Sequence, residues 1–446
     1  MTIELERPGA AVIPANRVNE ILSSHILADG FELVLDLHKS HGRMLVDERN
    51  GTSYLDMFGF FASNALGMNH PDLAGDERFL AELTTAALNK PSNSDIYTVE
   101  MARFVDTFAR VLGDPHLPHL FFVDGGALAV ENALKVAFDW KSRHNELHGR
   151  APELGTKVLH LTGAFHGRSG YTMSLTNTDP VKTARFPKFD WPRIDTPHTG
   201  AGPDIEALEA HALAQAEQAF AENPHDIACF IAEPIQGEGG DRHLRPQFLA
   251  AMQRLCHAND ALFVLDEVQT GVGLTGTTWA YQQLGVAPDV VAFGKKTQVC
   301  GIMAGGRVDE VADNVFHVSS RLNSTWGGNL TDMVRSRRVL EVLERDRLIE
   351  GAVPLGAFLL DRLGELAAAH PDMVSQARGR GLMCAVTLAT PELRDRVVTQ
   401  LREREHVLLL GTGERGVRFR PPLTVTENEL RQAVDALDAV LTRERR

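Results

Sequence analysis

The stretch that decides the fold runs from Leu262 to Lys296 and reads LFVLDEVQTGVGLTGTTWAYQQLGVAPDVVAFGKK. It begins with a short apolar run that ends at Asp266. It closes with a second apolar run, which is followed by Gly294, Lys295 and Lys296. A glycine-rich loop and a helix-like run separate the two. The pattern predicts two buried strands, one ending in a carboxylate and the other in a lysine.

A crevice beyond the carboxyl ends of the strands is where open parallel sheets bind ligands. An amine and a carboxylate placed there suit a cofactor that needs a covalent amine tether and an anion beside a ring nitrogen, and pyridoxal phosphate has both needs. These residues alone leave other interpretations open. Asp266 and Glu267 also fit a metal-binding or Walker-B-like carboxylate pair, and paired lysines before a loop are usually solvated. The G-x-G-x-x-G phrase at 271–276 is followed by a poor helix start, so a dinucleotide site is rejected.

Composition is that of an ordinary globular protein of 446 residues, with 43% hydrophobic and 23% charged residues. This length predicts two domains or one large α/β domain. A net charge of −14 argues against a nucleic-acid-binding surface. No apolar segment reaches the length of a membrane span, and the N-terminus has no signal-peptide pattern. Four scattered cysteines favour the cytoplasm. No histidine spacing with a third ligand indicates a metal, so none is predicted.

Alternating strands and helices predict a mostly parallel sheet with helices on both faces in the middle of the chain. We expect an N-terminal arm and meander at 1–75, a large α/β domain at 76–335, and at 336–446 an α+β unit that packs with the meander. The expected meander includes a strand at Leu33–Leu37, after a helix at Val18–Leu27. A last strand of the large domain is expected at Ile302–Ala304 and Arg307–Val308.

Two loops that follow predicted strands carry groups suited to bind anions. Asp124-Gly125-Gly126-Ala127 joins a strand to a helix, where backbone N–H groups can approach a phosphate. A tight turn explains the same residues equally well. In the second loop Phe165 could stack on a flat ring, and Arg168 could bind a carboxylate through two hydrogen bonds. A lone arginine more often forms a surface salt bridge.

Four further polar residues carry little signal alone. Arg420, like Arg168, could bind a carboxylate, but more often such an arginine forms a surface salt bridge. Glu238 lies in a glycine-rich loop and is by default a solvated carboxylate. Asn323 and Thr325 are loop residues without a signal of their own.

Taken together, eight phrases in correct order resemble the class III pyridoxal-phosphate aminotransferases. They are GGALAVENALK, GAFHGRSG, AEPIQGEGG, DEVQTG, PDVVAFGKK, STWGGN, RGRGLM and RFRPPLT, and they span nearly the whole chain. Within the class, ALNKPSNSD, FPKFDWPR, AFGKKTQVCG and the double glycine before Ala127 are most similar to members that use the ε-amine of L-lysine. Many other members have Ser-Gly-Thr/Ser at 125–127, so backbone amides would carry more of the phosphate binding here. The resemblance implies fold type I, with a small α+β domain built from both termini.

The resemblance also implies roles for the matched residues. Lys295 would hold pyridoxal 5'-phosphate covalently and carry a proton during the reaction; register selects it over Lys296, because it lies six residues after Pro288-Asp289. Asp266 would pair with the ring nitrogen. The remaining cofactor contacts implied are Val268 and Phe165 on the two ring faces, Gln269 at the phenolic oxygen, Gly126 and Ala127 at the phosphate, and Thr325 from a neighbouring subunit. The active site would therefore be shared in a homodimer.

The implied reaction transfers the ε-amino group of L-lysine to 2-oxoglutarate. It gives L-glutamate and 2-aminoadipate 6-semialdehyde, which cyclises to 1-piperideine-6-carboxylate. Arg168 would bind the carboxylate distal to the reacting carbon, and Arg420 the one next to it, which lysine lacks; Asn323 would also contact substrate. Glu238 would pair with Arg420 during the lysine half-reaction, because an unpaired buried guanidinium is costly. The alternatives are an ω-aminotransferase with ornithine or 4-aminobutyrate as donor, and a pyridoxal-phosphate-binding regulator without turnover.

Overall fold

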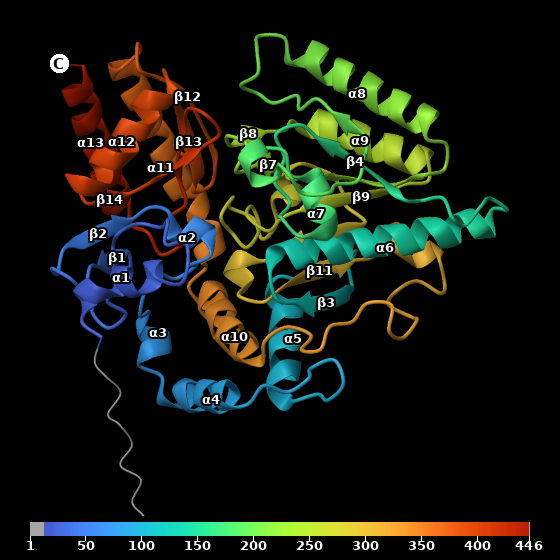
Figure 1. Ribbon diagram of the computed structural model, residues 1–446, viewed down its shortest axis with the longest axis horizontal. Helices are drawn as coiled ribbons and strands as arrows, with labels where there is room; N and C mark the ends of the chain where they lie inside the picture. The colour runs from blue at the N-terminus through green and yellow to red at the C-terminus, as the bar shows by residue number, and fades with distance from the viewer. Residues whose placement is uncertain (1–12, 446) are drawn as a thin grey trace, which may run out of the picture.

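Figure 1 shows the computed structural model of the chain, which describes residues 13–445. The start of the predicted N-terminal arm, residues 1–12, lies outside this range. One large sheet with its helices and a two-stranded sheet, β7 (Ile235–Gln236) and β8 (Arg242–His243), form the larger part of the molecule, and two smaller sheets with their helices form the rest. Within residues 13–445 no helix is both long and apolar enough to cross a membrane.

The large sheet has seven strands in the order β3-β11-β10-β9-β6-β4-β5. Strand β11 runs antiparallel to both of its neighbours, and the remaining pairs are parallel. The bounds are β3 (His119–Val123), β4 (Lys157–Leu161), β5 (Arg193–Ile194), β6 (Ile227–Ala232), β9 (Leu262–Asp266), β10 (Val290–Phe293) and β11 (Cys300–Ala304). The predicted mostly parallel α/β sheet is confirmed.

Alternate residues of the central strands pack into two separate cores. In β9, Phe263 and Leu265 join the core that includes α9 and α10, whereas Leu262 and Val264 join the core that includes α6. Because both faces are covered, these strands read as continuous apolar runs. The helices of this part are α5 (Val99–Val111), α6 (Gly126–Leu147), α7 (Gly170–Leu175), α8 (Ile205–Glu222), α9 (Pro246–Ala258) and α10 (Leu330–Arg345).

The predicted helix-like run between β9 and β10 is wrong. The connection consists of turns and one short 3₁₀ helix, Ala280–Gln283. Gly273 and Gly276 have φ of 83° and 95°, a left-handed conformation that turns the chain instead of continuing a helix. The connection still brings β10 back beside β9 in parallel, with Ala292 opposite Asp266.

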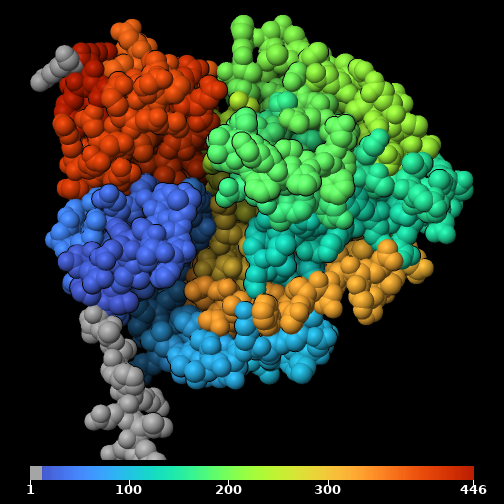
Figure 2. Space-filling model, in the orientation of Figure 1, coloured from blue at the N-terminus to red at the C-terminus, as the bar shows by residue number. Residues whose placement is uncertain are grey.

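The smaller part joins the two ends of the chain. Strand β14 (Val407–Leu408) pairs in parallel with β2 (Ser53–Asp56), which pairs with β1 (Met44–Val46). Figure 2 shows the N-terminal and C-terminal segments, in blue and red, packed against each other. A four-stranded sheet adjoins them, with β12 (Val374–Arg380), β13 (Met383–Leu388), β16 (Gly416–Phe419) and β15 (Leu410–Thr412) in that order. The domain boundaries at residues 75 and 335 stay predictions.

Short helices precede the large sheet and three longer ones cover the C-terminal strands. They are α1 (Val18–Ser23), α2 (Gly59–Ala62), α3 (Pro71–Ala74), α4 (Glu77–Leu88), α11 (Leu348–Ala369), α12 (Pro391–Glu403) and α13 (Glu427–Glu444). The helix predicted at Val18–Leu27 is therefore shorter than expected.

One predicted strand is wrong, and a second is confirmed only in part, because Ile302–Ala304 belongs to β11 but the segment after it is not a strand. Leu33–Leu37 makes a single bridge, from Leu35 to Asp47, because the Asp36 carboxylate accepts two backbone N–H groups just ahead of it and turns the chain. The segment at Arg307–Val308 is part of a 3₁₀ helix, Gly306–Glu310, which begins at a glycine with φ of 54°.

Candidate active site

A cavity of about 830 Å³ lies at the carboxyl ends of β9 and β10. It brings together residues from the large sheet, from α2 and from the turn after β7 (Ile235–Gln236). Most of the predicted site residues line it: Gly126, Ala127, Phe165, Arg168, Glu238, Asp266, Val268, Gln269 and Lys295. Arg420, Asn323 and Thr325 do not line it.

Lys295 begins the turn that follows β10 and faces this cavity. Its φ of 59° is unusual for a residue with a side chain, and the turn is closed by a 2.8 Å hydrogen bond from the Gln298 N–H to its carbonyl oxygen. Burial, with the charges of Arg418 and Arg420, lowers the pKa of Lys295 to about 8. A larger share of the amine is therefore neutral and nucleophilic near neutral pH.

Lys296 points elsewhere. Its Nζ donates to the carbonyl oxygens of Ala62 at 3.1 Å and of Gln269 at 3.2 Å. Burial and the neighbouring Lys295 lower its pKa to about 7. Of the two adjacent lysines, only the first is directed to the cavity, which agrees with the choice made from sequence register.

Asp266 ends β9 and is held by two hydrogen bonds. Its Oδ2 lies 2.8 Å from Nδ1 of His166, and its Oδ1 accepts the Val268 N–H at 3.0 Å. Burial alone would lower the pKa of His166, but the hydrogen bond and charge of Asp266 outweigh it and raise the pKa. His166 was not predicted as a site residue from the sequence. Its position next to Phe165 in the phrase GAFHGRSG was the signal that could have found it.

The start of α6 forms the expected glycine-lined cradle. Gly125, the residue before the helix, has φ of 100°, and no side chain caps the helix end. A Cβ on Gly126 would lie 3.0 Å from Cγ1 of Val268. The free N–H groups and the positive end of a long helix can therefore bind a phosphate close to the cavity.

Glu233, after β6, ties two loops of the cavity together. Its two oxygens accept the N–H groups of Phe165 and Gly237, each at 3.0 Å. Burial raises its pKa to about 7, although these bonds and His166 oppose that effect. No signal in the sequence separates Glu233 from the other acids of its loop.

The charged groups beside the cavity pair differently from the expectation. Arg420 is buried and donates to Asp241 at 2.5 Å and to Gln269 at 2.9 Å. Glu238 pairs instead with Lys182 at 2.6 Å and Arg418 at 3.1 Å. The pair of Glu238 with Arg420, expected for the lysine half-reaction, is therefore not formed in this structure.

The physical reason is that a second acid is available. Asp241, fully buried and three residues after Glu238, meets the guanidinium of Arg420, so this arginine is not unpaired. Glu238 forms an ion pair with Arg418 instead, a buried arginine of β16 that lies two residues before Arg420. Burial alone would raise the pKa of Glu238, but the charges of Arg418 and Lys182 lower it.

Arg168 lines the cavity and is exposed. Within residues 13–445 it has no ion-pair or hydrogen-bond partner, so the alternative of a surface salt bridge is not realised there. A substrate carboxylate can therefore reach its guanidinium without displacing a protein group.

Asn323 and Thr325 lie in an exposed loop before α10. That loop is fastened to residues 92–95: Ser94 Oγ donates to the Ser324 carbonyl at 2.6 Å, and Asn93 donates to the Gly328 carbonyl at 2.9 Å. Neither residue meets the cavity of its own chain.

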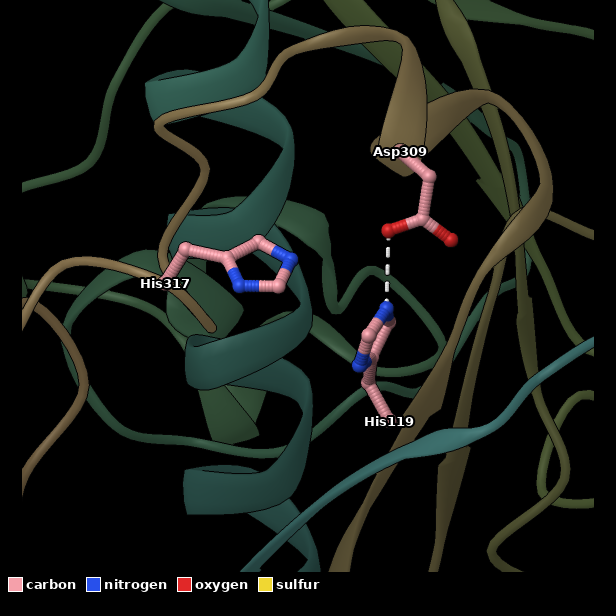
Figure 3. Close-up of side chains that lie close together, drawn as sticks. All are labelled: His119, Asp309 and His317. Atoms are coloured by element: carbon pink, nitrogen blue, oxygen red, sulfur yellow. Dashed lines mark hydrogen bonds and ion pairs between the residues drawn. The ribbon is translucent and has the colours of Figure 1, made fainter.

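A second group of titratable side chains, drawn in Figure 3, does not line this cavity. His119 Nε2 is 2.7 Å from Asp309 Oδ1, and His317 stands beside them; the possible ligand atoms of all three lie within 4.8 Å of one another. This group cannot be recognised from the spacing of histidines in the sequence, because its members come from β3, a 3₁₀ turn and a loop. His119 also stacks on Phe316, with ring centroids 4.9 Å apart, so the group fastens this loop to the sheet edge.

A lysine, a carboxylate and an uncapped helix end around one cavity of an α/β protein define an enzyme that holds a phosphate-bearing cofactor through an amine. The chain belongs to the class-III aminotransferase family, whose model matches residues 28–441.

Two relatives and one solved structure are similar over nearly the full length. The L-lysine-epsilon aminotransferase of Mycobacterium tuberculosis is 66% identical, with 96% of this chain and 95% of the relative covered. The L-lysine-epsilon aminotransferase of Amycolatopsis lactamdurans is 60% identical, with 98% and 99% covered. A solved structure of the M. tuberculosis lysine aminotransferase superimposes with a TM-score of 0.96 at 66% identity, covering 97% of this chain and 100% of the other.

Proposed function

We propose that the chain is a pyridoxal-phosphate-dependent aminotransferase that moves the ε-amino group of L-lysine to 2-oxoglutarate. The products are L-glutamate and 2-aminoadipate 6-semialdehyde, which cyclises to 1-piperideine-6-carboxylate. The observation that carries the proposal is the convergence of Lys295, Asp266 and the glycine end of α6 on one cavity. Relatives at 60% and 66% identity that are named for lysine support the donor.

The residues present fit the cofactor. Asp266, carrying a negative charge and fixed by His166, would face a ring nitrogen, and the N–H groups at the start of α6 would hold the phosphate. Phe165 and Val268 line the same cavity and would enclose the ring. When bound, pyridoxal phosphate supplies an aldehyde that joins an amine and a ring that withdraws electrons from the adjacent carbon.

Lys295 would carry the proton at the reacting carbon. Lys295 is half-buried, and its pKa of about 8 allows the amine both to accept and to return a proton near neutral pH. Lys296 cannot replace it, because its amine donates hydrogen bonds to two backbone carbonyl oxygens and does not line the cavity.

The arginines would orient the two substrates in turn. Arg168, without a protein partner in residues 13–445, would bind the carboxylate far from the reacting carbon. Arg420 would bind the second carboxylate of 2-oxoglutarate, which requires its hydrogen bonds with Gln269 and Asp241 to rearrange. Glu238 would offset the charge of Arg418 while lysine, which has no second carboxylate, is bound.

Two further features belong to the proposal. Thr325 and Asn323 would complete the cavity of a second copy, which makes the enzyme a homodimer. This is supported by the exposure of large apolar side chains beside their loop, at Ile96, Tyr97 and Trp326. A cytoplasmic location is supported by four cysteines that are all buried and free.

An absorbance titration of the cofactor-loaded enzyme with L-lysine, L-ornithine and 4-aminobutyrate, without keto acid, tests the proposal. We expect L-lysine at low concentration to abolish the visible band of the bound cofactor, and 2-oxoglutarate to restore it. Loss of the band with ornithine or 4-aminobutyrate instead would change the donor and keep the mechanism. A band that no amine affects would favour the alternative of a pyridoxal-phosphate-binding protein without turnover.

Size-exclusion chromatography with light scattering tests the shared site. We expect Trp326→Glu to yield monomers with little activity. An active monomer would contradict the dimer.

A further inference from the structure

A second cavity, of about 810 Å³, adjoins the active-site cavity. It lies between the loops of the large sheet that carry residues 178–200 and 238–242 and the small sheet at 376–378 and 411–416. Lys182 and Glu238 line both cavities, so their 2.6 Å ion pair forms the shared wall. We call this second space the arginine cavity.

The wall of the arginine cavity is rich in cations. Lys182, Arg242, Arg378, Arg394 and Arg415 line it, against three acids, Asp179, Glu238 and Glu414. Glu238 is already shared with the Arg418 guanidinium, and Asp179 caps the following turn by accepting the Val181 N–H. In a protein of net charge −14, this is a local excess of positive charge.

Arg242 has no protein partner in this wall. Within residues 13–445 its guanidinium makes no hydrogen bond and no ion pair, although it is half-buried and burial lowers its pKa. Arg378 beside it is bonded to the carbonyl oxygens of Gly240, Asp241 and Gln376 and to a threonine hydroxyl, with no carboxylate among its partners. The charges of Glu414 and Asp241 act on Arg242 and Arg378, but neither carboxylate forms an ion pair with these guanidinium groups, so an anionic ligand can contact both directly.

Two further groups supply hydrogen bonds to an anion. The hydroxyl oxygen of Thr178, which lines the cavity, is buried without a partner in the described chain. Burial, with Arg242 and Arg378, lowers the pKa of His198 to about 4, so its ring is neutral. Its Nδ1 accepts the Gly200 N–H at 3.3 Å, which leaves the proton on Nε2 as a donor.

We propose that the arginine cavity binds a small multivalent anion of carboxylate or phosphate type, and that Lys182 links its occupancy to Glu238 in the active-site cavity. An anion beside Arg242 attracts the Lys182 ammonium and weakens its hold on Glu238, which then balances Arg418 alone. The linkage rests on the proposed function, whereas the binding site stands independently of it.

Isothermal titration of the cofactor-loaded enzyme with inorganic phosphate, in a chloride buffer, tests the site without turnover. The loaded cofactor occupies the glycine cradle, so phosphate cannot bind there. We expect saturable binding that Arg242→Gln weakens on the order of tenfold, since a charge-assisted bond is lost. The matched control is Arg254→Gln, which removes the same charge from an exposed arginine of α9 outside both cavities.

A conservative variant separates a lost contact with the anion from a loss of folded protein. Thr178→Val keeps the shape of the side chain and removes only the hydroxyl, and we expect a smaller loss of phosphate affinity. Absence of saturable binding in the wild type, or equal losses in Arg242→Gln and Arg254→Gln, would overturn the site.

Glutarate, a five-carbon dicarboxylate without a keto group, distinguishes the source of the anion. It also reaches Arg168 in the active site, so only the part of its binding lost in Arg242→Gln counts. Tighter Arg242-dependent binding of glutarate than of phosphate assigns the cavity to dicarboxylates of the substrate class; the reverse assigns it to phosphate-type anions.

The linkage is measured in single turnover with L-lysine. We expect saturating phosphate to change the rate of the lysine half-reaction in the wild type and not in Lys182→Gln. An equal response in both would remove Lys182 from the mechanism. Failure of lysine to react at all would concern the proposed function and would leave the titration result unaffected.

Discussion

The active-site cavity and the cluster of charged residues beside it, which we call the cofactor end and the arginine end, are built on different principles. At the cofactor end, Asp266 and Lys295 follow neighbouring strands of one sheet, whose register places Asp266 opposite Ala292, three residues before the lysine. At the arginine end, Arg418 and Arg420 come from the small sheet and meet Glu238 and Asp241 from the large one, about 180 residues away. The first is fixed by the order of strands, and the second by charges that have more than one possible partner.

The largest expected effect is at the cofactor end. Lys295→Ala removes the amine that would hold the cofactor and move the proton, so we expect the lysine half-reaction to slow by at least about a thousandfold. Stopped-flow absorbance measures it. As a comparison, Lys296→Met, which removes an amine bonded only to backbone carbonyl oxygens, should keep the visible cofactor band. A coloured Lys295→Ala enzyme and a colourless Lys296→Met enzyme would reverse the assignment.

The next effect concerns stability at the arginine end. Asp241→Asn leaves the buried guanidinium of Arg420 without its carboxylate, which should cost about 3 kcal/mol of unfolding free energy. Denaturant unfolding of the cofactor-loaded protein measures the loss. Glu238→Gln, at a site that is only part-buried, is the control and should cost much less. Equal losses in the two variants would show that Asp241 stabilises the buried arginines no more than Glu238 does.

A smaller effect separates the two half-reactions. Glu238→Ala should slow the lysine half-reaction about tenfold and the glutamate half-reaction less, because the carboxylate offsets Arg418 and Lys182 when the substrate brings only one carboxylate. Single-turnover assays of both halves measure the ratio. Losses of the same size in both would rule out a selective role for Glu238.

The smallest effect is a pH dependence at the cofactor end. The pKa of His166 is raised by Asp266 above its ordinary value of 6.5. Its stabilising contribution is therefore complete below that value and is lost as the pH rises through the higher pKa of the folded state. Asp266→Asn should flatten the unfolding free energy of the cofactor-free protein across this range. The same slope in variant and wild type would mean that the pair does not titrate there.

Local signals in the sequence found the strands and loops of the cofactor end, and the family phrases then selected one interpretation of their charged residues. The apolar runs before Asp266 and Lys295 are buried on both faces, so they stand out without an alignment. The glycines at 125 and 126 are needed for a positive φ and for close approach to Val268, and such needs are visible in the residue type.

The arginine end was only half predictable. The arginine and glutamate at 420 and 238 could be named from the family phrases, but their partners are decided by how two sheets pack. Asp241 and Arg418 looked like ordinary neighbours of the named residues until the fold buried both. Strand β12, which reads VSQARGR, was also missed, since its residues are mostly polar and partly exposed, and it has no apolar run.

The pairing of β2 with β14 affects how the protein folds during its synthesis. Leu55 and Val407 are register partners at opposite ends of the chain, so this sheet cannot close on the ribosome until synthesis is almost complete. The large sheet can assemble while the edge of β2 that pairs with β14 is still free. Loss of the last forty residues would then leave an assembled cofactor end without its arginines, and an open strand edge prone to aggregation.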